Sequence, residues 1–224
     1  MVKNVKIMAF NESYKRWHTP KRNNFNEDGS LKKGESYQGY YKITNRDKYV
    51  GNPDLIIFRS SWEFSFCKWC DFSPSIVRWG SEPVRIPYYD KVSKLAKCKE
   101  LGIDPNNPKN WVTKFYTTDF WIQVKKADGS IEKWFVEIKP GGKLHKPVPP
   151  DRNAPLAQIK RYNRLVREYL VNEEKFKAIE EWANKNGTKF YIFTEDELRH
   201  YGIIGGRFDI KKEDLIYASS AGRK

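Results

Sequence analysis

Residues 131–140, IEKWFVEIKP, decide the fold of this chain, because they form a short run of strand-forming residues that ends in two charges. Alternate side chains of a strand point to opposite faces, so Trp134, Val136 and Ile138 share one face, which we expect to be the core face. Glu137 and Lys139 lie on the other. A carboxylate and an ammonium two residues apart on a rigid strand suit a metal-dependent site, although a solvated surface pair is the commoner origin of this pattern.

A second β-branched and aromatic run, residues 115–124, comes before the first and is joined to it by residues 125–130. Two such runs with Asp128-Gly129 between them predict a β-hairpin. Two loops are compatible with the sequence, and they place Asp119 differently.

A two-residue Asp128-Gly129 loop would set Asp119 opposite Ile138, with Glu137 on the other face. A three-residue loop, 127–129, closed by a left-handed glycine, would instead set Asp119 opposite Glu137. Only the second gathers two carboxylates for a hard divalent cation, with the ammonium of Lys139 beside them.

The composition favours a polyanionic partner. The formal net charge is +14 over 224 residues, and no apolar stretch approaches about 18 residues, so nucleic acid is a better candidate than a membrane. The three cysteines are an odd number and the histidines are scattered, which argues against a disulfide framework or a zinc site. We expect buried free thiols.

A helix is predicted from Ser60 to Asp71, with an apolar stripe formed by Trp62, Phe66, Trp69 and Cys70. Ser60 and Glu63 have the spacing of a capping box. Glu63 is therefore either a reciprocal cap or a third carboxylate beside the metal, and the spacing favours neither. If it joins the site, we expect this helix to pack against the face that carries Asp119 and Glu137.

The remaining segments predict an α/β fold. Residues 76–88 form one or two extended segments, and Leu156 to Val171 a helix with Ile159, Tyr162, Val166, Tyr169 and Leu170 on its apolar face. Asn172 can cap a further helix that ends before Gly187, and a buried strand at 189–193 is followed by a capped helix ending at Gly202. A strand that returns by a helical crossover predicts a mixed sheet flanked by helices.

Three regions are expected along the chain. Residues 1–39 form a basic N-terminal extension, residues 40–202 the main domain, and residues 203–224 a C-terminal tail. Residues 90–113 form a long polar insertion in the main domain.

Several ordered strings resemble the head completion nucleases of T-even-like tailed phages, which belong to the PD-(D/E)xK superfamily. These strings are FRSSWE (58–63), WGSE (79–82) with IPY (86–88), YTTDFW (116–121), VEIKP (136–140) and the stretch 189–202. The resemblance runs from about Tyr40 to Gly202 and implies a restriction-endonuclease-like fold. Thr118 replaces the proline that usually precedes the metal-binding aspartate, and the insertion at 90–113 is longer than the family pattern.

The resemblance implies a site built from Glu63, Asp119, Glu137 and Lys139. The three carboxylates would bind Mg²⁺ or Mn²⁺ together with the carbonyl of Ile138, and Lys139 would act on the attacking water and the phosphate. Gln158 and Tyr162 match a weak Gln-x-x-x-Tyr motif of some relatives. The residues expected to contact DNA are Lys143, Lys146, Gln158, Lys160, Arg161 and Arg164.

These expectations define a metal-dependent DNA nuclease that acts in phage head completion after DNA packaging, without sequence preference. Its partners would be portal or neck proteins. It would be located in the host cytoplasm during virion assembly, or on the virion itself. Two alternatives stay open: a structural head or neck protein that binds the packaged DNA end, and a nuclease of the same superfamily that cleaves transposon ends or junctions.

Overall fold

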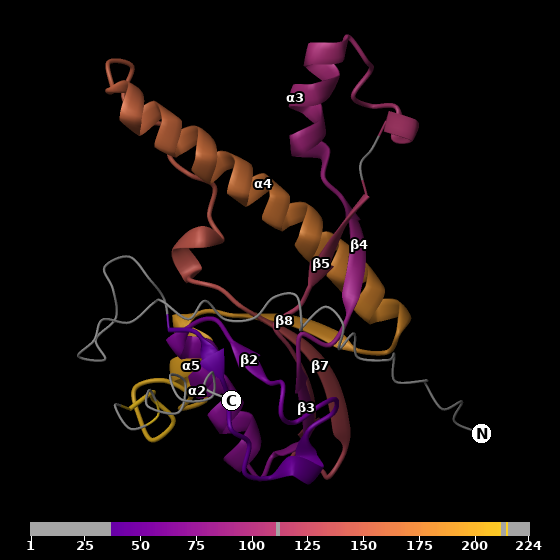
Figure 1. Cartoon of the computed structure of the whole chain (residues 1–224), viewed down its shortest axis with the longest axis vertical. Helices are drawn as coiled ribbons and strands as arrows, with labels where there is room; N and C mark the ends of the chain where they lie inside the picture. Colours follow the sequence, from indigo (N-terminus) through magenta and orange to yellow (C-terminus); the bar gives the residue numbers. More distant parts are fainter. Residues whose placement is uncertain (1–36, 111–112, 212–213, 215–224) are drawn as a thin grey trace.

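The computed structural model describes residues 37–110, 113–211 and 214, and its centre is a four-stranded mixed sheet in the order β3-β6-β7-β8 (Figure 1). Two-stranded sheets, β1-β2 and β4-β5, accompany it. The elements are β1 (Gly39–Tyr40), η1 (Arg46–Lys48), β2 (Ile57–Phe58), α2 (Ser61–Phe72), β3 (Ile76–Ser81), β4 (Arg85–Tyr89), α3 (Lys91–Leu101), η2 (Pro108–Asn110), β5 (Thr113–Thr117), β6 (Phe120–Lys125), β7 (Ile131–Ile138), η3 (Gly141–Lys143), α4 (Leu156–Lys185), β8 (Lys189–Phe193) and α5 (Glu195–His200).

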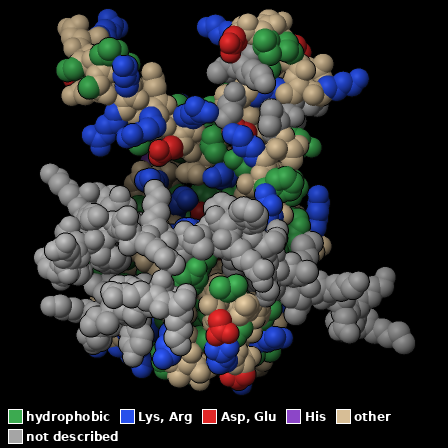
Figure 2. Space-filling view, in the orientation of Figure 1, with side chains coloured by type: hydrophobic (Ala, Val, Ile, Leu, Met, Phe, Trp, Pro, Cys, Tyr) green, Lys and Arg blue, Asp and Glu red, His purple; other side chains and the backbone are tan. Residues whose placement is uncertain are grey.

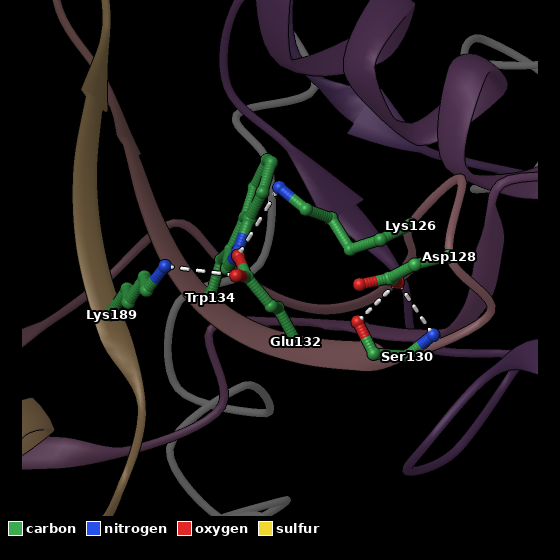
Figure 3. A network of polar contacts seen from close by, with 6 residues as sticks. All are labelled: Lys126, Asp128, Ser130, Glu132, Trp134 and Lys189. Atoms are coloured by element: carbon green, nitrogen blue, oxygen red, sulfur yellow. Dashed lines mark hydrogen bonds and ion pairs between the residues drawn. The ribbon is translucent and has the colours of Figure 1, made fainter.

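The hairpin between β6 and β7 has the three-residue loop. Lys126 N–H donates to the Ser130 carbonyl at 2.8 Å, and Gly129 adopts a φ of +83°, the left-handed conformation that this loop requires. Figure 3 shows Asp128 accepting hydrogen bonds from the backbone and hydroxyl of Ser130 at the turn. Farther along β7, the Glu132 carboxylate accepts hydrogen bonds from Trp134 Nε1–H and from the ammonium of Lys189 in β8.

The predicted continuous strand over 115–124 is wrong, because the chain changes sheet at Thr118 and Asp119. Before this point β5 pairs antiparallel with β4, and after it β6 pairs with both β3 and β7. The two halves differ in their pairing partners and not in their packing, since Tyr116 of β5 and Trp121 of β6 lie in the same apolar cluster, while Phe120 points into the main core. Asp119 therefore lies at a backbone break, immediately before β6.

Both faces of the main sheet are buried. Ile122, Val136 and Ile138 join the core formed with α2 and α5, as the alternation predicts, and Phe66 of α2 stacks 4.5 Å from Phe120. The opposite face is also covered, since Phe135 packs with Ile179 of α4. All three cysteines are buried free thiols, as expected.

The expectation that α2 packs on the face of Asp119 and Glu137 is wrong. The stripe of α2 fits the aliphatic and aromatic face that carries Ile122 and Val136, while the face with Glu137 is covered by α4. The first turn of α2 still lies at the end of the sheet, and this brings Glu63 near the site from the other side.

Two predicted helices over 156–186 are one. The 30-residue helix α4 runs through Asn172, because no glycine or proline interrupts Leu156 to Lys185 and an asparagine side chain offers a cap only where the backbone already breaks. Its C-terminal half packs on the sheet through Ile179 and Ala183, and its N-terminal half extends beyond the sheet (Figure 1). No helix in the described ranges combines the length and apolarity needed to cross a bilayer.

The insertion expected at 90–113 contains α3 and η2, which the ribbon β4-β5 carries away from the main sheet (Figure 1). The space-filling view shows this arm and the N-terminal half of α4 as two lobes, with Lys and Arg side chains in the hollow between them (Figure 2). Beyond the boundary expected at Gly202, Ile203 and Phe208 are buried in the main core. Of the basic extension, residues 1–36 lie outside the described residues.

Candidate active site

Asp119, Glu137 and Lys139 come together at the end of β7. Because the register pairs Phe120 with Val136 and Lys126 with Ser130, Asp119 falls opposite Glu137. The Asp119 Oδ2 atom accepts a hydrogen bond from the backbone N–H of Ile138 at 2.8 Å, and Lys139 Nζ donates to Glu137 Oε1 at 2.8 Å. The ammonium thus serves as counter-charge to a carboxylate buried on the sheet.

Glu63 forms the predicted cap and also lies close enough to Asp119 to act on it electrostatically. Its Oε2 atom accepts the backbone N–H of Arg59, and its Oε1 atom accepts the hydroxyl of Ser60, which in turn caps the helix by accepting Glu63 N–H. Its charge also reaches Asp119 and raises the pKa of that carboxyl. The cap therefore holds Glu63 beside the other two carboxylates.

Crowded acidic groups dominate the electrostatics of the site. Burial, followed by the charges of Glu137 and Glu63, raises the pKa of Asp119 well above its ordinary value. Burial raises the pKa of Glu63 to about 7, against the opposing hydrogen bonds from Arg59 and Ser60. Burial lowers the pKa of Lys139, but Glu137 and then Asp119 outweigh it and the net direction is upward.

The sequence assigned no role to Glu82, which follows β3 and contacts both Asp119 and Arg59. Its N–H donates to the Asp119 carbonyl at 2.8 Å, and its Oε1 atom accepts from Arg59, whose own N–H holds Glu63. Its φ of +46° is strained for a residue with a side chain. The string WGSE pointed to this position but could not reveal the backbone conformation.

Tyr116 is a second residue that the sequence did not single out as part of the site. Its hydroxyl and the Glu137 Oε2 atom are both buried; among the described residues neither makes a hydrogen bond of ordinary geometry, although the Tyr116 hydroxyl lies close enough to Glu137 for a weaker one. Burial, then the charges of Glu137 and Asp119, and last this weaker hydrogen bond raise the pKa of the Tyr116 hydroxyl. A buried carboxylate oxygen without a hydrogen bond of ordinary geometry fits a site that takes a cation.

The residues fit a divalent metal by their chemistry, since carboxylate oxygens are the donors that Mg²⁺ and Mn²⁺ prefer. In the described part of the chain no three Asp, Glu, His or Cys side chains are arranged as a ready metal-holding group. Lys139 is paired with Glu137, and Glu63 accepts hydrogen bonds from Arg59 and Ser60. Ile138 contributes its N–H to Asp119, and the role of its carbonyl stays a prediction.

The residues expected to contact DNA lie on the loop after β7 and on the first half of α4. They are all exposed: Lys143, Lys146, Gln158, Lys160, Arg161 and Arg164. Lys143 and Arg164 line a cavity that Lys139 also borders, whereas the other four do not. The Gln158 and Tyr162 pair lies near the helix start, outside that cavity.

Comparison with known proteins agrees with this architecture. Residues 73–195 match the family described as TnsA-like endonuclease N terminal, a range that contains Asp119, Glu137 and Lys139 and leaves out Glu63. Over 170 residues the chain is 35% identical to the head completion nuclease of Enterobacteria phage T4, and the match covers 76% of this chain and 99% of that protein. The chain belongs to the family of phage head completion nucleases. The chain has a restriction-endonuclease-like fold, consistent with the PD-(D/E)xK superfamily, and the family relationship supports a nuclease function.

Proposed function

We propose that this chain is a Mg²⁺- or Mn²⁺-dependent DNA endonuclease, with Glu63, Asp119, Glu137 and Lys139 as its catalytic set. The observation that carries the proposal is that the register places Asp119 opposite Glu137 and beside Lys139, where burial and the charge of Glu137 raise the pKa of Asp119. Buried carboxylates that lie close together destabilise the fold unless they bind a cation, and such clusters are typical of functional sites.

In this proposal Asp119, Glu137 and Glu63, with the Ile138 carbonyl, hold the metal. A bound divalent cation polarises a phosphoryl oxygen and lowers the pKa of a coordinated water. Lys139 has three donors and no acceptor, so on leaving Glu137 it can orient the attacking water and donate to the phosphate oxygens as negative charge develops. Arg59 and Ser60 keep the Glu63 carboxylate in place through their hydrogen bonds.

The substrate is DNA bound through its backbone without sequence readout, as the net charge of +14 favours. We further propose that the nuclease domain runs from about residue 40 to Phe208, because Ile203 and Phe208 pack in its core beyond the boundary expected at Gly202, and that residues 1–39 are an N-terminal extension. We propose that the protein acts in head completion, in the host cytoplasm or on the virion, with portal or neck proteins as partners. The similarity to the T4 protein over 99% of that protein supports this role.

The decisive experiment is incubation of the purified chain with supercoiled and linear DNA in Mg²⁺, Mn²⁺ or EDTA. Cleavage is expected with either metal and none with EDTA, and Asp119→Ala and Lys139→Ala should each abolish it. Asp47→Asn, an exposed aspartate on η1, is the matched control and should cleave like the wild type. Metal-independent cleavage, or wild-type rates in either folded variant, contradicts the proposal, and DNA binding without cleavage favours the structural head or neck protein.

A further inference from the structure

A cavity of about 320 Å³ opens beside Lys139, between the loop after β7 and the middle of α4. Basic side chains dominate its lining, which consists of Lys139, Lys143, Arg164, Arg167, Glu168, Val171, Asn172 and Lys175. We propose that this cavity binds a backbone phosphate of the DNA strand, next to the phosphate that is cleaved. The inference rests on the proposed function and extends the DNA-binding surface to Arg167 and Lys175.

The helical residues of the lining form one face of α4. They recur at three- and four-residue intervals: Arg164, Arg167, Glu168, Val171, Asn172 and Lys175. This spacing stacks side chains along one side of a helix, so the cations of α4 are directed to a common space. A randomly solvated basic face would not close over a cavity against Lys139 and Lys143 of another segment.

The net charge of the cavity favours an anion. Among the described residues that line it, Lys139 is already paired with Glu137, and the other four basic residues face one carboxylate, Glu168. The ion pair between Glu168 and Lys143 is 3.8 Å long and has both side chains about half exposed. Such an exposed pair contributes little, so Lys143 can exchange it for a phosphate. Arginine and lysine side chains that converge in this way are the usual donors to phosphate oxygens.

Lys175 is held at the cavity by two aromatic rings. Its Nζ atom lies 5.3 Å from the ring centre of Tyr116 and 5.8 Å from that of Tyr88, so two aromatic rings fix an ammonium on the wall of the cavity. Burial and the nearby charge of Lys139 lower the pKa of Lys175, which agrees with cations crowded around a space that an anion would relieve. An ammonium placed in advance loses little freedom when the phosphate binds.

The cavity is continuous with the candidate active site, because Lys139 borders the cavity and also pairs with Glu137. A strand whose scissile phosphate reaches Lys139 therefore presents its next phosphate to Lys175 and Arg167. The ligand is a phosphate group that is either an internal phosphodiester or a terminal phosphate at a DNA end.

The test compares Lys175→Met with Lys177→Met, a matched change two residues along α4 at an exposed lysine that does not line the cavity. Binding of a fluorescent 20-base-pair duplex is measured in EDTA, so that no turnover is needed. Lys175→Met should weaken binding about tenfold and reduce the slope of log affinity against log salt by about 0.9, as expected for one lost phosphate contact. Lys177→Met should match the wild type.

Two further arms identify the source of the phosphate and separate this inference from the proposed function. A loss by Lys175→Met on closed circular DNA supports an internal phosphodiester, and a loss confined to linear DNA with a 5′-phosphate, relative to a 5′-hydroxyl, supports a terminal one. Affinity and salt slope equal to those of Lys177→Met on every probe would overturn the inference, even if the wild type cleaves. Binding through Lys175 in a protein that never cleaves would leave the inference standing and refute the nuclease function.

Discussion

Removing the ammonium of Lys139 should destabilise the metal-free protein far more than removing the ammonium of a more exposed pair, Lys189 with Glu132, which joins β8 to β7. Lys139 and Glu137 are paired at 2.8 Å with side chains 26% and 3% exposed, whereas Lys189 and Glu132 are paired at 2.9 Å with side chains 57% and 26% exposed. The two pairs match in residue type and distance, but Glu137 is buried, whereas Glu132 is more exposed and has a second cation, Lys126, at 3.8 Å. Lys139→Met and Lys189→Met therefore compare the loss of a counter-charge from a buried carboxylate with its loss from a more exposed carboxylate that keeps another cation.

The loss of stability depends on the charge that remains buried after the substitution. Lys139→Met leaves a buried Glu137 carboxylate without its counter-charge, a change that typically destabilises by about 3–5 kcal/mol; because Lys139 is partly exposed, we expect about 3 kcal/mol. Lys189→Met should change the free energy of unfolding by at most about 1 kcal/mol, and Glu132 keeps its bond from Trp134.

The assay is urea unfolding at neutral pH in EDTA, repeated with saturating Mg²⁺. With a denaturant slope of about 3 kcal/mol per molar, the midpoint of Lys139→Met should fall by about 1 M. Mg²⁺ supplies the missing positive charge, so it should narrow the gap between Lys139→Met and the wild type and leave Lys189→Met unaffected. Equal midpoints for the two variants in EDTA, or a gap that Mg²⁺ does not change, would refute the reasoning.

Three other outcomes are expected. The pKa of Glu63 is raised from 4.5 to about 7, so the folded state disfavours the ionised carboxylate and the free energy of unfolding falls as pH rises through this range. Metal-free Glu63→Gln should therefore be more stable than the wild type by up to about 3 kcal/mol at about pH 8 and by almost nothing at about pH 4. Urea unfolding at the two pH values measures the difference. Asp71 is fully buried and accepts hydrogen bonds from Tyr41, Thr44 and Asn45. Asp71→Ala should therefore lower the free energy of unfolding by about 3–5 kcal/mol. A loss below about 1 kcal/mol would show that water replaces the carboxylate. Affinity for duplex DNA should drop about a thousandfold between about 50 and 200 mM salt if six or more phosphates are neutralised, and a flat response in a titration would count against binding through the backbone.

The local patterns of the sequence determined the hairpin, the parallel return to β8 and the placement of Glu137 beside Lys139. These features depend on short-range physics: alternation has a period of two, a glycine at φ > 0 closes a three-residue turn, and a crossover helix must separate parallel strands. The sequence also limited Asp119 to two positions, opposite Ile138 or opposite Glu137. The register that the tertiary structure adopts selects the second.

Only the tertiary structure decided which partners each segment meets. The break before Phe120 exists because β5 pairs with β4 whereas β6 pairs with β3 and β7, and α4 is continuous because nothing in the fold requires a break at Asn172. Glu63 could not be placed from its spacing, since the same cap serves an isolated helix and a site. Its approach to Asp119, and the assembly of Lys175 with Lys139, depend on contacts between residues far apart in sequence, which local pattern does not encode.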